Sequence, residues 1–97
     1  MIYVKIHRAN GETILAACDE EILGQTFTGG CAKLRVSEGF YGGELVSEDT
    51  FIERMRSFTI MNLVGERTVS IAMNEGYVDA GCVMDIGGTR HAQVVKG

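Results

Sequence analysis

Residues 37–44 read SEGFYGGE and separate a strand-like segment from a helix-like one. Glycine tolerates positive φ and close backbone approach, so the three glycines of this stretch predict a tight loop or bulge. The strands and helices on either side are expected to be arranged around it. In an extended chain, neighbouring side chains point in opposite directions. One of the rings of Phe40 and Tyr41 is therefore expected inside the protein and the other at its surface.

This loop admits two interpretations. Tyr41 offers an aromatic ring with a polar tip and Glu44 a carboxylate, while Gly42 and Gly43 offer backbone amides. Rigidly held loops of this kind often bind ligands. Alternatively, the glycines only permit a turn and the aromatic rings fill the core, which is the more common use of such residues.

Before the loop, Asn10-Gly11 predicts the first β-hairpin, because both residues tolerate the positive φ of a type I′ turn. Residues 13–18 form the partner strand. A two-residue turn places Ile6 opposite Leu15, and this register agrees with the alternation of apolar residues.

Residues 19–36 are expected to form a short helical turn, a loop and a strand. Asp19 is a candidate cap for the turn and Gly24 can end it. Residues 25–30 are predicted to be a loop. In the strand that follows, Ala32, Leu34 and Val36 face inward, and the outward-facing residues are Lys33 and Arg35.

After the loop, the spacing predicts two helices. Ser47 is a suitable cap for the first, whose apolar positions include Phe51, Met55 and Phe58. The second is predicted to begin at Asn62 as its cap and to run to about Asn74.

The C-terminal segment predicts a second hairpin. Its two-residue turn, Gly87-Gly88, places Asp85 opposite Arg90 in a favourable cross-strand pair. We therefore predict a single α+β domain over residues 1–97. Its mainly antiparallel sheet is built from the N- and C-terminal hairpins plus a middle strand, with two to three helices packed on one face.

Composition narrows the classes of function. The chain has 97 residues and a formal charge of −4, which does not favour a protein that coats nucleic acid through bulk charge. No apolar run approaches the roughly 20 residues of a membrane helix. The N-terminus lacks the pattern of a secretion signal. These features predict a soluble cytoplasmic protein without a membrane partner.

The three cysteines do not form a recognisable metal or disulfide pattern. Cys18 and Cys31 would have to combine with His7 and His91, but ligand pairs in known zinc sites lie two to five residues apart. The expected state is therefore free thiols, with no metal and no cofactor.

Common catalytic motifs are missing as well, which argues against an enzyme. His91 would serve as an acid or base only if it met Glu44 and Glu66 in a concave pocket. Separately, a helix beginning near Asn62 with Arg67 beside it would suit a phosphate. Capping by Asn62 explains the same residues without a ligand.

For RNA, the best candidate surface is the strand face that carries Lys33 and Arg35. Tyr3 and Tyr41 are possible stacking rings. The same residues also fit an ordinary solvated strand face. Further cations expected to help are Lys5, Arg8 and Arg90.

Taken in order along the chain, several segments resemble DUF424, a small archaeal family of unknown function. The resemblance implies an archaeal cytoplasmic protein linked to RNA binding or translation, and it transfers no catalytic residues. The matching segments are VKIHR (residues 4–8), CDEEILG (18–24), FYGGE (40–44), NLVGE (62–66) and HAQVV (91–95).

Three hypotheses of function follow, in order of preference. The first is a module that binds RNA or ribosomal particles through Lys33, Arg35 and the Tyr41 loop. The second is a protein–protein adaptor or homo-oligomer anchored by Phe40 and Tyr41. The third is an enzyme or small-ligand protein using His91, Glu44 and Glu66. The candidate contact residues are Lys33, Arg35, Tyr41, Gly42, Gly43, Glu44, Asn62, Glu66, Arg67, Arg90 and His91.

Overall fold

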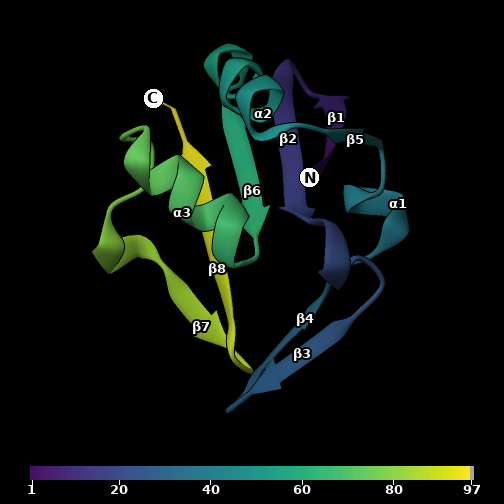
Figure 1. Ribbon diagram of the computed structural model, residues 1–97, viewed down its shortest axis with the longest axis vertical. Coiled ribbons are helices and arrows are strands. Elements are labelled where there is room, and N and C mark those ends of the chain that lie inside the picture. Colours follow the sequence, from purple (N-terminus) through teal and green to yellow (C-terminus); the bar gives the residue numbers. More distant parts are fainter. Residues whose placement is uncertain (97) are drawn as a thin grey trace.

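A six-stranded, mainly antiparallel sheet forms the centre of the computed structural model, which describes residues 1–96 (Figure 1). The strand order is β5-β1-β2-β6-β8-β7, and only the β2–β6 pair is parallel. The predicted α+β class is therefore confirmed. The strands of this sheet are β1 (Ile2–Ala9), β2 (Glu12–Asp19), β5 (Glu44–Val46), β6 (Ile60–Val64), β7 (Met84–Ile86) and β8 (Thr89–Val95).

Both predicted hairpins are present in the predicted register. Asn10 and Gly11 have φ values of 52° and 77°, as a type I′ turn requires. Ile6 lies opposite Leu15 across β1 and β2. In the second hairpin, Asp85 of β7 lies opposite Arg90 of β8. Turn chemistry was a reliable guide in both cases because a two-residue loop determines the pairing beyond it.

The strand that joins the two hairpins was predicted wrongly. Residues 62–66 were expected to begin a helix, but β6 (Ile60–Val64) lies between β2 and β8. Leu63 packs into the core on one side of the sheet and Val64 into the core on the other. A short apolar run buried on both faces has no diagnostic period, so its pattern fits a helix as well as a strand. The helix begins only after Gly65, whose φ is 112°.

The predicted middle strand belongs elsewhere. β4 (Ala32–Arg35) pairs with β3 (Thr26–Gly29) in a separate two-stranded sheet, so the predicted loop at residues 25–30 is largely a strand. Figure 1 shows this hairpin below the main sheet, with its tip against the tip of β7–β8. A Cβ on Gly29 would lie 2.7 Å from the backbone nitrogen of Gly87, so the two tips approach as closely as only glycine permits.

Helices cover the sheet on both faces. The larger core lies under α2 (Glu48–Arg54) and α3 (Glu66–Asn74), which share one face as predicted (Figure 1). We call this the α2/α3 face. A smaller core on the opposite face, the α1 face, lies under the single-turn helix α1 (Glu38–Tyr41). Three 3₁₀ turns complete the fold: η1 (Glu20–Ile22), η2 (Met55–Ser57) and η3 (Ala80–Cys82).

Candidate functional site

The glycine-rich stretch at residues 37–44 folds into α1 and the turn after it. The Ser37 hydroxyl accepts a hydrogen bond from the Phe40 amide at 3.2 Å and so caps this helix. The Gly42 amide donates to the Glu38 carbonyl at 2.8 Å, and the Gly43 amide to the Tyr41 carbonyl at 2.9 Å. Both glycine amides are therefore bonded within the loop, and the expected ligand-facing backbone donors are not free.

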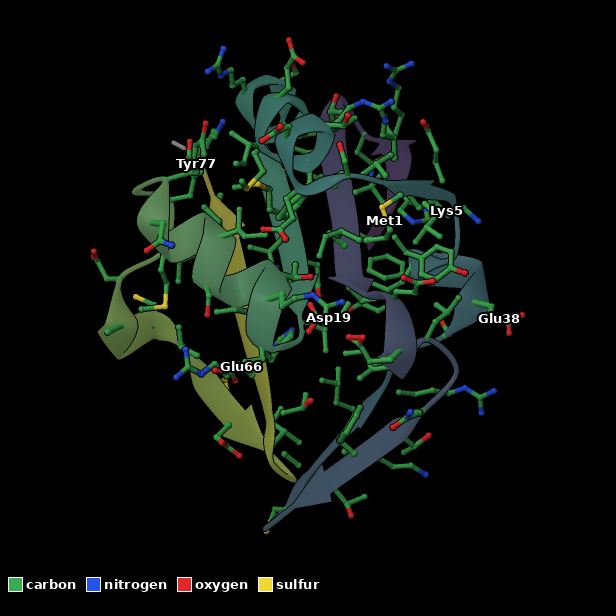
Figure 2. All side chains as sticks on the ribbon, viewed as in Figure 1. Met1, Lys5, Asp19, Glu38, Glu66 and Tyr77 are labelled. Carbon is green, nitrogen blue, oxygen red and sulfur yellow. The ribbon has the colours of Figure 1, made fainter. Side chains whose placement is uncertain are left out.

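The glycines serve the close packing of this loop on the sheet. A Cβ on Gly43 would collide with the carbonyl oxygen of Val4 in β1, and one on Gly42 would lie 2.6 Å from the Glu38 carbonyl oxygen. The side chains of Lys5 and His7, both from β1, also contact α1. The Lys5 ammonium donates to the Gly39 carbonyl at 2.7 Å, and Figure 2 shows Lys5 beside α1.

The two aromatic residues separate as predicted, one inside and one near the surface. Tyr41 is buried, with 3 % of its surface exposed. Phe40 is half-buried and stacks on the His7 ring, with centroids 4.6 Å apart and 13° between the planes. His7 Nε2 also lies 2.8 Å from the Phe40 carbonyl oxygen. A buried Tyr41 ring cannot stack on a base or anchor a protein interface, so both proposed contact roles for Tyr41 are wrong.

Three of the predicted contact residues do meet, at the centre of the α1 face. The Tyr41 hydroxyl donates to Asn62 Oδ1 at 2.6 Å, and His91 Nε2 lies 3.2 Å from the same oxygen. An amide oxygen only accepts hydrogen bonds, so this contact requires the His91 tautomer protonated on Nε2. The predicted capping role of Asn62 is thus wrong. Its side chain instead links α1 to β8 across β6.

The electrostatics of this triad favour neutral groups. Burial, with a smaller contribution from Cys18, raises the pKa of Tyr41 to about 12. Burial also lowers the pKa of His91, so its imidazole is uncharged near neutral pH. A neutral phenol, amide and imidazole that bond to one another suit a structural link between elements.

Glu44 and Glu66 do not join the triad. Glu44 on β5 accepts from Arg54 Nη2 at 3.2 Å, and Glu66 pairs with Arg90 Nε at 3.3 Å. Strands β1, β2 and β6 separate β5 from β8. At about 4.8 Å per strand spacing, Glu44 lies roughly 19 Å from His91. The pocket that was to combine His91, Glu44 and Glu66 does not form.

The start of α3 is already occupied by a carboxylate of the protein itself. Asp19 Oδ2 accepts from the Arg67 amide at 3.1 Å, and Oδ1 accepts from the Thr68 amide at 2.8 Å. Figure 2 shows Asp19 at this helix end, in the middle of the molecule. Asp19 therefore caps α3 and not the turn that follows it in sequence. An external phosphate has no place here, and the Arg67 guanidinium pairs with Glu21 at 2.8 Å.

Lys33 and Arg35 point away from the core, as predicted. On the same side of the β3–β4 hairpin, Thr28 lies opposite Lys33 and Thr26 opposite Arg35. Neither cation takes part in an ion pair within residues 1–96. The other expected cations are not on this hairpin: Lys5 and Arg8 belong to β1, and Arg90 belongs to β8.

The part of the chain that the structure describes contains no cluster of three His, Cys, Asp or Glu side chains able to hold a metal ion. Likewise, none of its helices has the length and apolar character needed to cross a membrane. Cys18 is buried, whereas Cys31 and Cys82 are exposed and unbridged.

Comparison with known proteins identifies the family. The model of a protein family of unknown function, DUF424, matches residues 7–96. The chain belongs to the DUF424 family. A crystal structure of an uncharacterized conserved protein from Methanopyrus kandleri is similar to this DUF424 protein, with a TM-score of 0.79 and 24 % identity. The match covers 99 % of this chain and 93 % of that one, and at this identity it supports the fold alone. No curated protein matches the chain significantly.

Proposed function

We propose that this DUF424 protein binds RNA, free or within a ribosomal particle, through one face of the β3–β4 hairpin. This hairpin outer face consists of Thr26, Thr28, Lys33 and Arg35. Cationic side chains contact phosphates, and threonine hydroxyls add hydrogen bonds to phosphate or sugar oxygens. Such contacts position an RNA without reading its sequence.

One observation carries the proposal: these two cations are unneutralised in a protein whose net charge is negative. Arg54, Arg67 and Arg90 each pair with a glutamate. Residues 25–37, by contrast, contain no aspartate or glutamate. A local basic surface on an acidic protein orients a polyanion, because repulsion elsewhere disfavours other binding modes.

Contacts on its inner side and at its tip hold the β3–β4 hairpin against the rest of the protein. Phe27 and Leu34, on its inner side, pack against the smaller core. Gly29 and Gly87 bring its tip against the β7–β8 turn. A rigid ribbon loses less conformational freedom on binding than a mobile loop does, which favours affinity.

Salt-dependent RNA binding tests the proposal. Fluorescence anisotropy with a short labelled single-stranded RNA would measure affinity between about 50 and 200 mM salt. We expect Lys33→Glu combined with Arg35→Glu to weaken binding for all sequences. The slope of log K against log salt should become shallower by about 0.7 for each lost phosphate contact. The control is Arg56→Glu, which reverses one exposed cation on another surface. Its affinity is compared with that of the single variants Lys33→Glu and Arg35→Glu.

Unchanged affinity in the double variant, or equal losses in Arg56→Glu and the single hairpin variants, would contradict the assignment of this face. The link to translation needs a separate measurement, sedimentation of the endogenous protein through a ribosome gradient. Comigration at low salt that is released at high salt would support it. A protein that stays at the top of both gradients would exclude ribosome association.

A protein partner is the second candidate, favoured by one apolar surface. Ile14, Ile60 and Val95 lie on neighbouring strands of the α1 face, and Val95 is 67 % exposed. Ile14 and Ile60 are half-buried beside it, and a contiguous apolar surface of this kind often marks an interface. Sedimentation equilibrium over a range of concentrations tests whether the partner is a second copy. Self-association that Val95→Lys abolishes would support it, and a monomer at all concentrations would exclude it.

A further inference from the structure

On the α2/α3 face, a surface hollow of about 370 Å³ opens between the first hairpin and the α2–η2 segment. Its volume falls at the lower end of the range of about 300–1,000 Å³ that is usual for small-ligand sites. The hollow is remote from the hairpin outer face and uses different residues. Those that matter here are Ile6, Arg8, Glu53 and Phe58.

Apolar side chains from two elements contribute to this hollow. Along β1, Ile2 and Val4 are fully covered by the core, but Ile6 on the same side is 41 % exposed. Phe58, directly after η2, contributes a ring that is itself largely buried. Ile6 therefore offers most of the exposed apolar surface, which a ligand of matching size would cover favourably.

Two opposite charges line the same hollow without neutralising each other. Arg8 extends from β1 and Glu53 from α2, yet they form no ion pair with each other or with any other residue among those described. The third charged residue of the lining, Arg54, is held by both carboxylate oxygens of Glu44 at 3.2 Å. The hollow thus presents one free cation, one free anion and an apolar surface.

We propose that this hollow binds a free α-amino acid with an apolar side chain. The carboxylate of the zwitterion would pair with Arg8 and its ammonium with Glu53, while the side chain covers Ile6 and Phe58. A purely anionic or purely cationic ligand would leave one of the two protein charges unmatched. Because the hollow is open and both charges are exposed, the affinity is expected to be weak, in the millimolar range.

The test uses ¹⁵N-labelled full-length protein titrated with L-phenylalanine and followed by amide chemical shifts. Saturable shifts should be confined to the lining residues. Two analogues each lack one charge: 3-phenylpropionate has no ammonium, and phenethylamine has no carboxylate. Each should bind about two- to five-fold more weakly, the value of one exposed charge pair.

Two variants make the assignment specific to each charge. In Arg8→Gln, phenylalanine should lose its advantage over phenethylamine but keep its advantage over 3-phenylpropionate. In Glu53→Gln, the reverse should hold. Arg56→Gln and Glu75→Gln change the same charges outside the lining of the hollow and should leave both preferences intact.

Analogues that bind as tightly as phenylalanine, or shifts scattered over the surface, would overturn the proposal. So would preferences that survive both variants. The result is independent of RNA binding, because none of the lining residues named above belongs to the hairpin outer face.

Discussion

Asp19 caps helix α3, which begins at Glu66, and Thr68 donates the two shortest hydrogen bonds of that contact. Asp19 Oδ1 accepts from both the amide and the hydroxyl of Thr68, at 2.8 and 2.7 Å. The separation is 48 residues to the Arg67 amide and 49 to Thr68. Both side chains are buried. This carboxylate therefore connects the first hairpin to α3 from inside the protein.

Removing that carboxylate should be among the most destabilising single changes. In Asp19→Ala, two buried donors on Thr68 and the part-buried Arg67 amide would lose their acceptor. We expect a loss of about 2 to 4 kcal/mol in the free energy of unfolding. Urea denaturation measures it. Ser47→Ala removes the exposed cap of α2 and should cost only about 1 kcal/mol. Equal losses in the two variants would show that burial of the Asp19 contact adds nothing.

The close approach of the glycine-rich turn to β1 makes a second prediction. Gly43→Ala forces a Cβ against the Val4 carbonyl oxygen, which must displace the loop or the strand and should cost about 1 to 3 kcal/mol. Gly39→Ala is the matched control, because a Cβ there meets no atom within 4 Å. It should be neutral or stabilise the protein by up to about 1 kcal/mol. Thermal unfolding of both variants compares them, and equal behaviour would contradict the packing argument.

How far the fold could be predicted depended on whether the deciding contacts were local. Asn10-Gly11 and Gly87-Gly88 determine hairpin registers within a few residues, so both pairings could be derived from the sequence. β6 could not, because a strand buried on both faces shows no alternation. The helix that Asp19 caps was also predicted wrongly. Asp19 directly precedes a plausible helical turn, and nothing near it in the sequence indicates a contact with Thr68.

The candidate site shows the same limit. Tyr41, Asn62 and His91 could each be identified as polar residues of interest, but their meeting depends on the order of strands in the sheet. The sequence predicted Arg8 only as an additional cation for RNA and predicted no role for Glu53, because a hollow between a hairpin and a helix has no sequence pattern. Local alternation did place Lys33 and Arg35 on the outward face, because residues two apart on one strand share a face.

The buried position of His91 predicts a pH dependence of stability. Burial lowers its pKa in the folded protein below the ordinary value of 6.5, so the unfolded chain binds the proton more readily. Stability from this group is complete above 6.5, declines as the pH falls towards the folded pKa, and levels off below it. Relative to His91→Gln, the wild type should therefore lose stability as the pH falls below about 6.5. Parallel curves for the two proteins would exclude the effect.

The three cysteines should differ sharply in reactivity. Burial, with added repulsion from the charges of Asp19 and Glu21, raises the pKa of Cys18 to about 12. Cys31 and Cys82 are exposed. Because the thiolate is the reactive form, iodoacetamide at neutral pH should modify Cys31 and Cys82 promptly and leave Cys18 intact.

Mass spectrometry after timed alkylation checks this difference site by site. Cys18 should react only when the smaller core opens, so its rate reports that opening. Tyr41→Phe removes the hydrogen bond to Asn62 that links α1 to β6 and should speed Cys18 labelling while leaving the rates of Cys31 and Cys82 unchanged. Rapid labelling of Cys18 in the wild type would mean that α1 does not stably cover this face of the sheet.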